Sequence, residues 1–296
     1  MFCFEGAKLR IKSPLPNKNT LFLKKSSINS ISTAVSSALI MQLNHGFPIF
    51  VHMEKTEWFA SWFDTSYYHS LYKNRDHKEA ERFIDNLVEN LQLPLGSKVL
   101  DLACGKGRHS MTLFTHGYNV LGVDLSPNSI EQAESFSNEH LQFQVHDMRK
   151  IIPNQKFDAV FNLFTSFGYF DSMEDNLRVL LAVHETLNPN GILVIDFMNA
   201  SKVVANLVTS ETKVEDDITF NISREYDGNH IFKHIAFEAD GTSHKYMERV
   251  QALKLADFST LLQHCGFNII RTFGDFDLGS FEETTSDRLI LIAQKV

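Results

Sequence analysis

Short apolar runs alternate with amphipathic segments across residues 98–200. The runs have the length and the apolar content of buried strands in a parallel sheet. The segments between them carry apolar residues at helical spacing, and Ser126-Pro127 begins one of them as a helix cap followed by proline. This alternation predicts a parallel sheet with right-handed crossovers. The predicted strands are 99–102, 120–124, 141–145, 157–164 and 192–196, and the predicted helices are 76–91, 130–136 and 173–187.

The apolar period changes to two between residues 213 and 253. Ile218, Phe220 and Ile222 alternate with polar residues, and the alternation resumes from Ile231 to Phe237. Asp-Gly pairs at 227–228 and 240–241 supply hairpin turns. The pattern predicts an antiparallel insertion of about three strands after the fifth parallel strand. A helix at 257–265 and strands at 268–273 and 289–293 are expected to complete the fold.

Aromatic residues crowd the region before the first predicted strand. Residues 58–72 include two Trp, two Phe and three Tyr, and the helix at 76–91 that follows is ended by Pro94 and Gly96. We therefore expect a helical cap over residues 53–97. Such aromatic side chains commonly form core, and the alternative is that Tyr68, Tyr72 or Arg75 contacts a ligand.

The composition is that of a globular protein, with 43% hydrophobic and 22% charged residues in a chain of 296. No apolar run approaches the roughly 20 residues that span a bilayer, so we expect no membrane partner. The cysteines Cys3, Cys104 and Cys265 form no CxxC pair and have no metal-ligand spacing. This usage favours a reducing compartment and predicts a cytoplasmic protein without a metal site.

Charge divides the chain near residue 52. Residues 1–52 contain six Lys or Arg and one acidic residue, whereas the remaining 244 contain 22 basic and 35 acidic residues. The basic segment has the composition of a transit peptide or a weak secretory signal. We favour a third interpretation, a disordered extension outside the fold with translation starting at Met53. The acidic remainder argues against nucleic acid as a partner, because that affinity depends on phosphate neutralisation.

The richest chemical signal joins the first two predicted strands. The first runs into a Gly-x-Gly turn at Gly105 and Gly107, four residues after Asp101, and the second ends at Asp124. Glycines let a ligand approach the backbone of this turn. A carboxylate beside the turn repels a pyrophosphate and attracts a cation, and Ser110 stands where a dinucleotide motif has its third glycine. Asp124 is placed to accept hydrogen bonds from both hydroxyls of a ribose.

A further acid, Asp147, follows the third predicted strand and precedes Met148. An acid can accept from the amino group of an adenine while a methionine packs on the ring. In this order, the motifs resemble the class I S-adenosylmethionine (SAM) dependent methyltransferases from about residue 98 to 196, and more loosely from 54 to 296. The tract at 162–170 and the β insertion are similar to a branch of bacterial small-molecule methyltransferases.

The resemblance implies an α/β fold, with a Rossmann-like seven-stranded, mostly parallel sheet, helices on both faces and a β insertion covering the active site. It implies SAM as the cofactor. It also implies a division into an extension (1–52), a helical cap (53–97), the SAM-binding core (98–200), the insertion as a substrate lid (201–254) and the remainder of the core (255–296). The cofactor residues expected are Asp101, Ala103, Gly105, Gly107, Asp124, Leu125, Asp147, Met148, Asn162, Tyr72 and Arg75.

The expected reaction is methyl transfer to an O, N or S nucleophile of a small molecule. The chain lacks the Asp/Asn-Pro-Pro-aromatic tetrapeptide of amino-directed DNA methyltransferases and the Pro-Cys nucleophile of the cytosine enzymes. A protein or tRNA acceptor, a non-catalytic SAM-binding role and aminopropyl transfer stay open as alternatives, as do monomer and homodimer. No spacing singles out a general base. The candidate catalytic residues are Tyr169, Thr165 and Asn199, and the candidate substrate residues are Tyr68, Phe167, Arg224 and Lys233.

Overall fold

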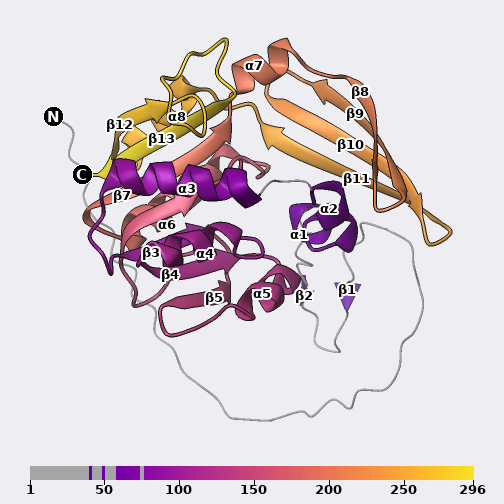
Figure 1. Cartoon of the computed structure of the whole chain (residues 1–296). Helices are drawn as coiled ribbons and strands as arrows, with labels where there is room; N and C mark the ends of the chain where they lie inside the picture. Colours follow the sequence, from indigo (N-terminus) through magenta and orange to yellow (C-terminus); the bar gives the residue numbers. More distant parts are fainter. Residues whose placement is uncertain (1–39, 42–48, 51–57, 74–76) are drawn as a thin grey trace. The chain divides into compact units, whose positions relative to one another are not determined.

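The computed structural model describes residues 40–41, 49–50, 58–73 and 77–296, whose course is drawn in Figure 1. The chain divides into two compact units, 1–54 and 55–296. In the first unit, strand β1 (Ile40–Met41) pairs antiparallel with strand β2 (Ile49–Phe50). The rest of the predicted extension, with Met53, lies outside the described residues, and so does Arg75.

The second unit is built on a seven-stranded sheet in the order β12-β13-β7-β6-β3-β4-β5. The five strands from β7 to β5 pair in parallel. Strand β13 is antiparallel to both of its neighbours, β7 and β12. The predicted mostly parallel sheet is therefore confirmed. Its strands are β3 (Lys98–Leu102), β4 (Asn119–Asp124), β5 (Leu141–Val145), β6 (Phe157–Asn162), β7 (Leu187–Met198), β12 (Phe267–Phe273) and β13 (Arg288–Lys295).

Alternation along the strands sends side chains to two separate cores. Val99 and Phe161 pack with helices α3 (His77–Leu91), α4 (Arg108–Thr115) and α5 (Pro127–Glu134) on one face. Leu100 and Leu102 pack with α6 (Met173–Thr186) and α8 (Leu255–His264) on the other. Because both faces are covered, the central strands are apolar at nearly every position, which is why they read as continuous apolar runs.

The fifth parallel strand begins earlier than its apolar run. The register of β6 and β7 jumps from Phe157 opposite Leu187 to Ala159 opposite Ile192, so residues 188–191 bulge out of the ladder. The predicted helix 173–187 and strand 192–196 left the Asn-Pro-Asn-Gly sequence at 188–191 between two elements. It instead forms an irregularity within β7, held between two paired segments.

The insertion has four antiparallel strands, in the order β11-β10-β9-β8, and not about three (Figure 1). They are β8 (Ser210–Glu215), β9 (Ile218–Tyr226), β10 (His230–Ala239) and β11 (Thr242–Gln251), and they follow the short helix α7 (Ala200–Ala205). The unexpected strand, β8, lies at the edge of the sheet and is mostly exposed. Strand β8 is recognised by its backbone pairing with β9. The sequence did not predict it, because a polar edge strand has no apolar period.

The cap contains helices α1 (Trp58–Trp62) and α2 (Ser66–Leu71), the second capped by the Thr65 hydroxyl. Trp62 and Leu71 are buried against apolar residues of the insertion such as Phe220 and Phe237. Trp62 also stacks on Tyr246 at 4.3 Å. The cap and the insertion therefore share one apolar core. Across the described ranges, no helix is long and apolar enough to cross a membrane.

Candidate active site

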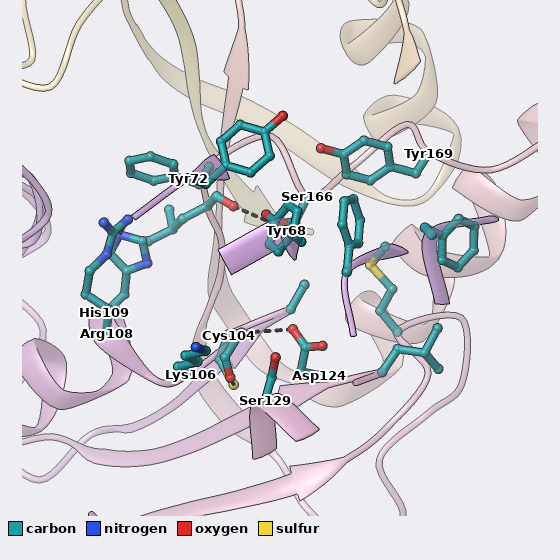
Figure 2. A pocket seen from close by; sticks show the side chains of 18 of the residues that line it. Tyr68, Tyr72, Cys104, Lys106, Arg108, His109, Asp124, Ser129, Ser166 and Tyr169 are labelled. Atoms are coloured by element: carbon teal, nitrogen blue, oxygen red, sulfur yellow. Dashed lines mark hydrogen bonds between the residues drawn. The ribbon is translucent and has the colours of Figure 1, made fainter. Parts of the chain in front are cut away.

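A cavity of about 430 Å³ opens at the carboxyl ends of β3, β4, β5 and β6, and Figure 2 shows its side chains. The strand order reverses between β3 and β6, which is where open α/β sheets place their ligands. The volume lies within the range of small-molecule and cofactor sites. Asp124 and Lys106 lie on one side of the cavity, and Tyr68, Ser166 and Tyr169 lie opposite (Figure 2).

The two glycines of the turn after β3 serve different purposes. Both have positive φ, +56° at Gly105 and +80° at Gly107. A Cβ on Gly105 would meet no atom within 4 Å, so a side chain there would project into the cavity that Gly105 lines. A Cβ on Gly107 would lie 2.6 Å from the ring of Phe143. Gly105 therefore keeps the cavity open, and Gly107 allows the turn to pack on β5.

Asp124, at the end of β4, lines the cavity with a carboxylate that the backbone already holds in place. One oxygen accepts from the Gly105 N–H and the other from the Ser126 N–H, each at 2.8 Å. Burial raises the pKa of this carboxyl, and the backbone donors oppose that shift. Each carboxylate oxygen keeps a further lone pair for a ligand hydroxyl.

Asp101 does not line the cavity. It lies inside β3 rather than at its end, so strand alternation turns its side chain toward α4, where it accepts from the Ser110 hydroxyl at 2.6 Å. Burial raises the pKa of Asp101 to about 6. Any attraction of this carboxylate for a bound cation must therefore act through the turn and not by contact.

Asp147 and Met148 both line the cavity beyond β5. The carboxylate of Asp147 accepts from the Arg149 guanidinium at 2.8–3.1 Å and from the Arg149 backbone N–H at 3.0 Å. The Arg149 hydrogen bonds and charge lower the pKa of Asp147 against the effect of burial. The acid is thus held as an anion at the cavity edge. Ala103 and Leu125 are further predicted residues that line the cavity.

Several predicted residues lie behind the wall of the cavity. Asn162 donates to the Leu102 carbonyl at 3.0 Å, and its buried Oδ1 has no hydrogen-bond partner among the described residues. The Thr165 hydroxyl accepts from Arg288 at 3.0 Å. Asn199 donates to two backbone carbonyls before β13, and Phe167 is buried against Phe258. The side chains of Thr165 and Asn199 are thus engaged in holding loops in place.

The cap supplies the opposite wall. Tyr68, Tyr72 and His69 line the cavity, and Tyr68 lies on the same side of it as Tyr169 and Ser166 from the loop after β6 (Figure 2). Burial, with Lys106 nearby, lowers the pKa of His69 to about 4, so this histidine is neutral at pH 7. The sequence marked Tyr68, Tyr72 and Tyr169 but not His69, because a lone histidine in an aromatic segment carries no spacing signal.

The insertion meets the cavity only through the cap in the part of the chain that the structure describes. Lys233 and Glu248 contact the Tyr72 hydroxyl, Glu248 at 2.7 and 2.8 Å, and none of the described lining residues comes from 201–254. Arg224 pairs with Glu211 on the insertion itself and does not line the cavity.

Lys106, Arg108 and Phe164 are among the lining residues that were not predicted. The Arg108 guanidinium lies 4.5 Å from the centroid of the Phe164 ring. Lys106 and Arg108 sit in the turn and at the start of α4, where positive charge suits an anionic ligand group. Lys106 lies between the two glycines and Arg108 directly follows them, so the sequence shows both cations. Whether their side chains reach the cavity depends on the direction in which the turn faces.

These features together define a nucleotide-type ligand site on a Rossmann-like sheet. Over residues 95–251 the chain matches the family described as "Methyltransferase domain", and it belongs to that family. A putative methyltransferase, YqeM, of Bacillus subtilis (strain 168) is 28% identical over 213 residues, covering 69% of this chain and 86% of the relative. A glycine/sarcosine N-methyltransferase of Aphanothece halophytica is 27% identical over 236 residues, covering 75% and 83%.

Solved structures show the same fold. A SAM-dependent methyltransferase from Clostridium acetobutylicum ATCC 824 superposes with a TM-score of 0.66 at 21% identity, over 77% of this chain and 96% of that one. DesVI of Streptomyces venezuelae gives 0.58 at 19% identity, over 77% and 97%. The chain is a SAM-dependent methyltransferase of class I, and the cofactor and family predicted from the sequence are confirmed.

Proposed function

We propose that this methyltransferase transfers a methyl group from SAM to an O, N or S nucleophile of a small molecule bound in the cavity between α2 and the loop after β6. The observation that carries the proposal is the open space at Gly105 beside the Asp124 carboxylate. A cofactor can lie against the backbone there while its ribose reaches a fixed acceptor.

In this proposal, the cofactor lies along the strand ends. Asp124 holds the ribose, and Asp147 with Met148 and Leu125 holds the adenine. The methionine part lies over Ala103 and Gly105, and Lys106 or Arg108 pairs with its carboxylate, a role that the sequence suggested for Arg75.

The bound SAM supplies an electrophilic methyl on a sulfonium. The protein's part is to hold the acceptor in line and to exclude water from it. Tyr68, Tyr169 and Ser166 face the cofactor side of the cavity and are the residues placed to orient the acceptor. An amine or hydroxyl acceptor also has to lose a proton. Tyr169 is the predicted catalytic candidate that lines the cavity, whereas Thr165 and Asn199 do not.

A small acceptor fits the size and the charge of the site. The cofactor claims a large share of a 430 Å³ cavity, and the acidic body of the chain disfavours a nucleic acid. The glycine/sarcosine relative acts on small molecules by its name. In the same proposal, residues 98–200 and 255–296 form the cofactor-binding core, and the cap with the 201–254 insertion forms the acceptor side.

The test is to incubate the full chain with methyl-labelled SAM and cell extract, and then to separate the extract by molecular size. We expect label in the small-molecule fraction. Asp124→Ala should lose it, because removing a charge-assisted pair of hydrogen bonds weakens SAM binding by about 1–3 kcal/mol. The matched control is Glu134→Ala, on the exposed end of α5. Label on protein or RNA would overturn the acceptor class, and SAM binding without transfer would support a non-catalytic role.

A further inference from the structure

Two consecutive residues at the cavity, one in its wall and one behind it, have a left-handed backbone. Phe164 and Thr165 each have φ of 59°, one residue after the end of β6. Neither is glycine, and Thr165 is β-branched, so this conformation is strained at both positions. Such a pair persists only where the surrounding structure holds it.

The end of β7 and the start of β13 provide that hold. Asp196, which is fully buried, accepts from the Phe164 N–H at 2.8 Å, and its own carbonyl accepts from the Thr165 N–H at 2.9 Å. Arg288 donates from Nε to the other Asp196 oxygen at 2.7 Å and from Nη2 to the Thr165 hydroxyl at 3.0 Å. The register of β7 and β13 explains the pairing, since Ile290 lies opposite Asp196 and Arg288 is its diagonal neighbour.

The held segment forms part of the cavity surface. Phe164 and Ser166 line the cavity on either side of Thr165. The Phe164 ring lies under the Arg108 guanidinium at 4.5 Å and beside the His109 ring at 5.3 Å. The direction of the 164–165 backbone therefore sets the place of the ring, of the Arg108 side chain on it and of the Ser166 hydroxyl.

We propose that Asp196 and Arg288 are positioning residues for the methyl-transfer reaction: they hold Phe164–Ser166 in the strained conformation that shapes the acceptor side of the cavity. The inference rests on the proposed function. Stability alone is a weak reason for a buried Asp196–Arg288 ion pair, because an apolar pair of similar size commonly stabilises a fold as well as a buried ion pair does. One carboxylate oxygen and the carbonyl of Asp196 instead match two donors of one short loop, and Arg288 Nη2 matches its hydroxyl acceptor. Arg288 Nε holds the second carboxylate oxygen of Asp196 in place.

The first test compares Asp196→Asn and Arg288→Lys with the same change at a neighbouring exposed pair. Asp287→Asn is the control, because Asp287 is largely exposed and pairs with Lys202 at 2.6 Å. We measure label transfer from SAM to the small-molecule fraction of cell extract, SAM binding by calorimetry, and hydrogen exchange of the peptide that spans 160–170. Both variants should transfer methyl about tenfold to a hundredfold more slowly, as misplacement of a reacting group by an ångström does. Their SAM affinity should fall by less than their transfer rate does, because Lys106 as well as Arg108 is placed to pair with the cofactor carboxylate, and exchange at 164–165 should rise.

The second test separates positioning from stability. Thr165→Gly removes the strain at φ 59°, because glycine adopts this region freely, and it removes the acceptor of Arg288 Nη2. We expect the melting temperature to be unchanged or higher while methyl transfer falls. Thr165→Ser, which keeps the hydroxyl, should retain more of the transfer than Thr165→Gly. This variant also keeps the proposal testable if Asp196→Asn does not fold.

The two hypotheses fail in different ways. If the wild-type chain labels nothing in any fraction, the proposed function fails. If it labels small molecules and Asp196→Asn, Arg288→Lys and Thr165→Gly all transfer at the rate of Asp287→Asn, the positioning role is refuted. A loss of transfer that only follows a loss of melting temperature across Asp196→Asn, Arg288→Lys, Thr165→Gly and Thr165→Ser would likewise refute it.

Discussion

Replacing each glycine of the turn by alanine should separate cofactor binding from folding. At Gly105, the added methyl meets no atom within 4 Å, and the cost to the fold is the left-handed backbone at φ +56°. That strain is about 1–2 kcal/mol, and alanine returns roughly 0.4–1 kcal/mol by restricting the unfolded chain. Gly105→Ala should therefore lower the free energy of unfolding by about 0–1.6 kcal/mol.

At Gly107, the same change should be more severe. The backbone strain is similar, and the methyl would lie 2.6 Å from two atoms of the Phe143 ring. That ring cannot simply move, because it also fills the space left by Gly122, where a Cβ would again lie 2.6 Å from it. With about 1–3 kcal/mol added for overpacking, and the same return from the unfolded chain, Gly107→Ala should lower the free energy of unfolding by about 1–5 kcal/mol.

The cofactor affinity should show the reverse order. The methyl of Gly105→Ala occupies the open space beside Asp124, and we expect SAM to bind at least about tenfold more weakly, or about 1.4 kcal/mol. For each kcal/mol of unfolding free energy lost, Gly107→Ala should lose less SAM affinity than Gly105→Ala does. Denaturant titration without cofactor and calorimetric titration with SAM measure the two quantities. SAM affinity like that of the wild type in Gly105→Ala, or a larger loss of stability there than in Gly107→Ala, would refute the assignment of the cavity.

Three further changes test the electrostatics and the cap. Asp101 has a folded pKa of about 6 above an unfolded value of 3.8, so ionising its carboxyl costs stability as pH rises through that window. Asp101→Asn should therefore stabilise the fold at pH 8 by up to about 3 kcal/mol. Equal stability of the wild type and the variant in denaturant titrations would contradict this. His69 has a folded pKa of about 4, below an unfolded value of 6.5, so the fold should lose up to about 3 kcal/mol of stability as pH falls from 6.5 to 4. His69→Gln should reduce this dependence of the melting temperature on pH. Glu248→Ala removes the carboxylate that accepts from Trp62 and Tyr72. It should destabilise the fold by about 1–3 kcal/mol and speed hydrogen exchange in α2. A melting temperature and hydrogen exchange like those of the wild type would contradict the role of Glu248 in joining the cap to the insertion.

The parts of the fold that follow from local pattern could be predicted from the sequence. The strands on either side of Gly105 are buried at most positions, and their apolar runs predicted them. Asp124 ends β4 and lines the cavity, because open α/β sheets place their ligands at the carboxyl ends of the strands. The paired insertion strands β9 and β10 followed from alternation and an Asp-Gly turn. These are short-range rules, and here they were sufficient.

The errors and omissions come from tertiary contacts. Asp101 was expected beside the ligand, but its place within β3 rather than at its end turns the side chain toward Ser110. Thr165 was expected to be catalytic, yet its hydroxyl is engaged by Arg288, 123 positions away. His69 was missed because only the assembled cavity gives it a neighbour such as Lys106 and withdraws it from water. No period or motif reports a partner at such separations.

The shared core of the cap and the insertion has a consequence for chimeras of this enzyme. Trp62 in α1 and Glu248 in β11 are 186 positions apart and joined by a hydrogen bond of 2.8 Å, and Lys213 donates to the Leu71 carbonyl at 2.8 Å. Two distant stretches of the chain are thus matched to each other. A chimera that takes only residues 210–251 from a relative would leave them without their matching partner, whereas exchanging 58–73 as well would move both sides of the shared core together and leave the loop after β6, with Ser166 and Tyr169, unchanged.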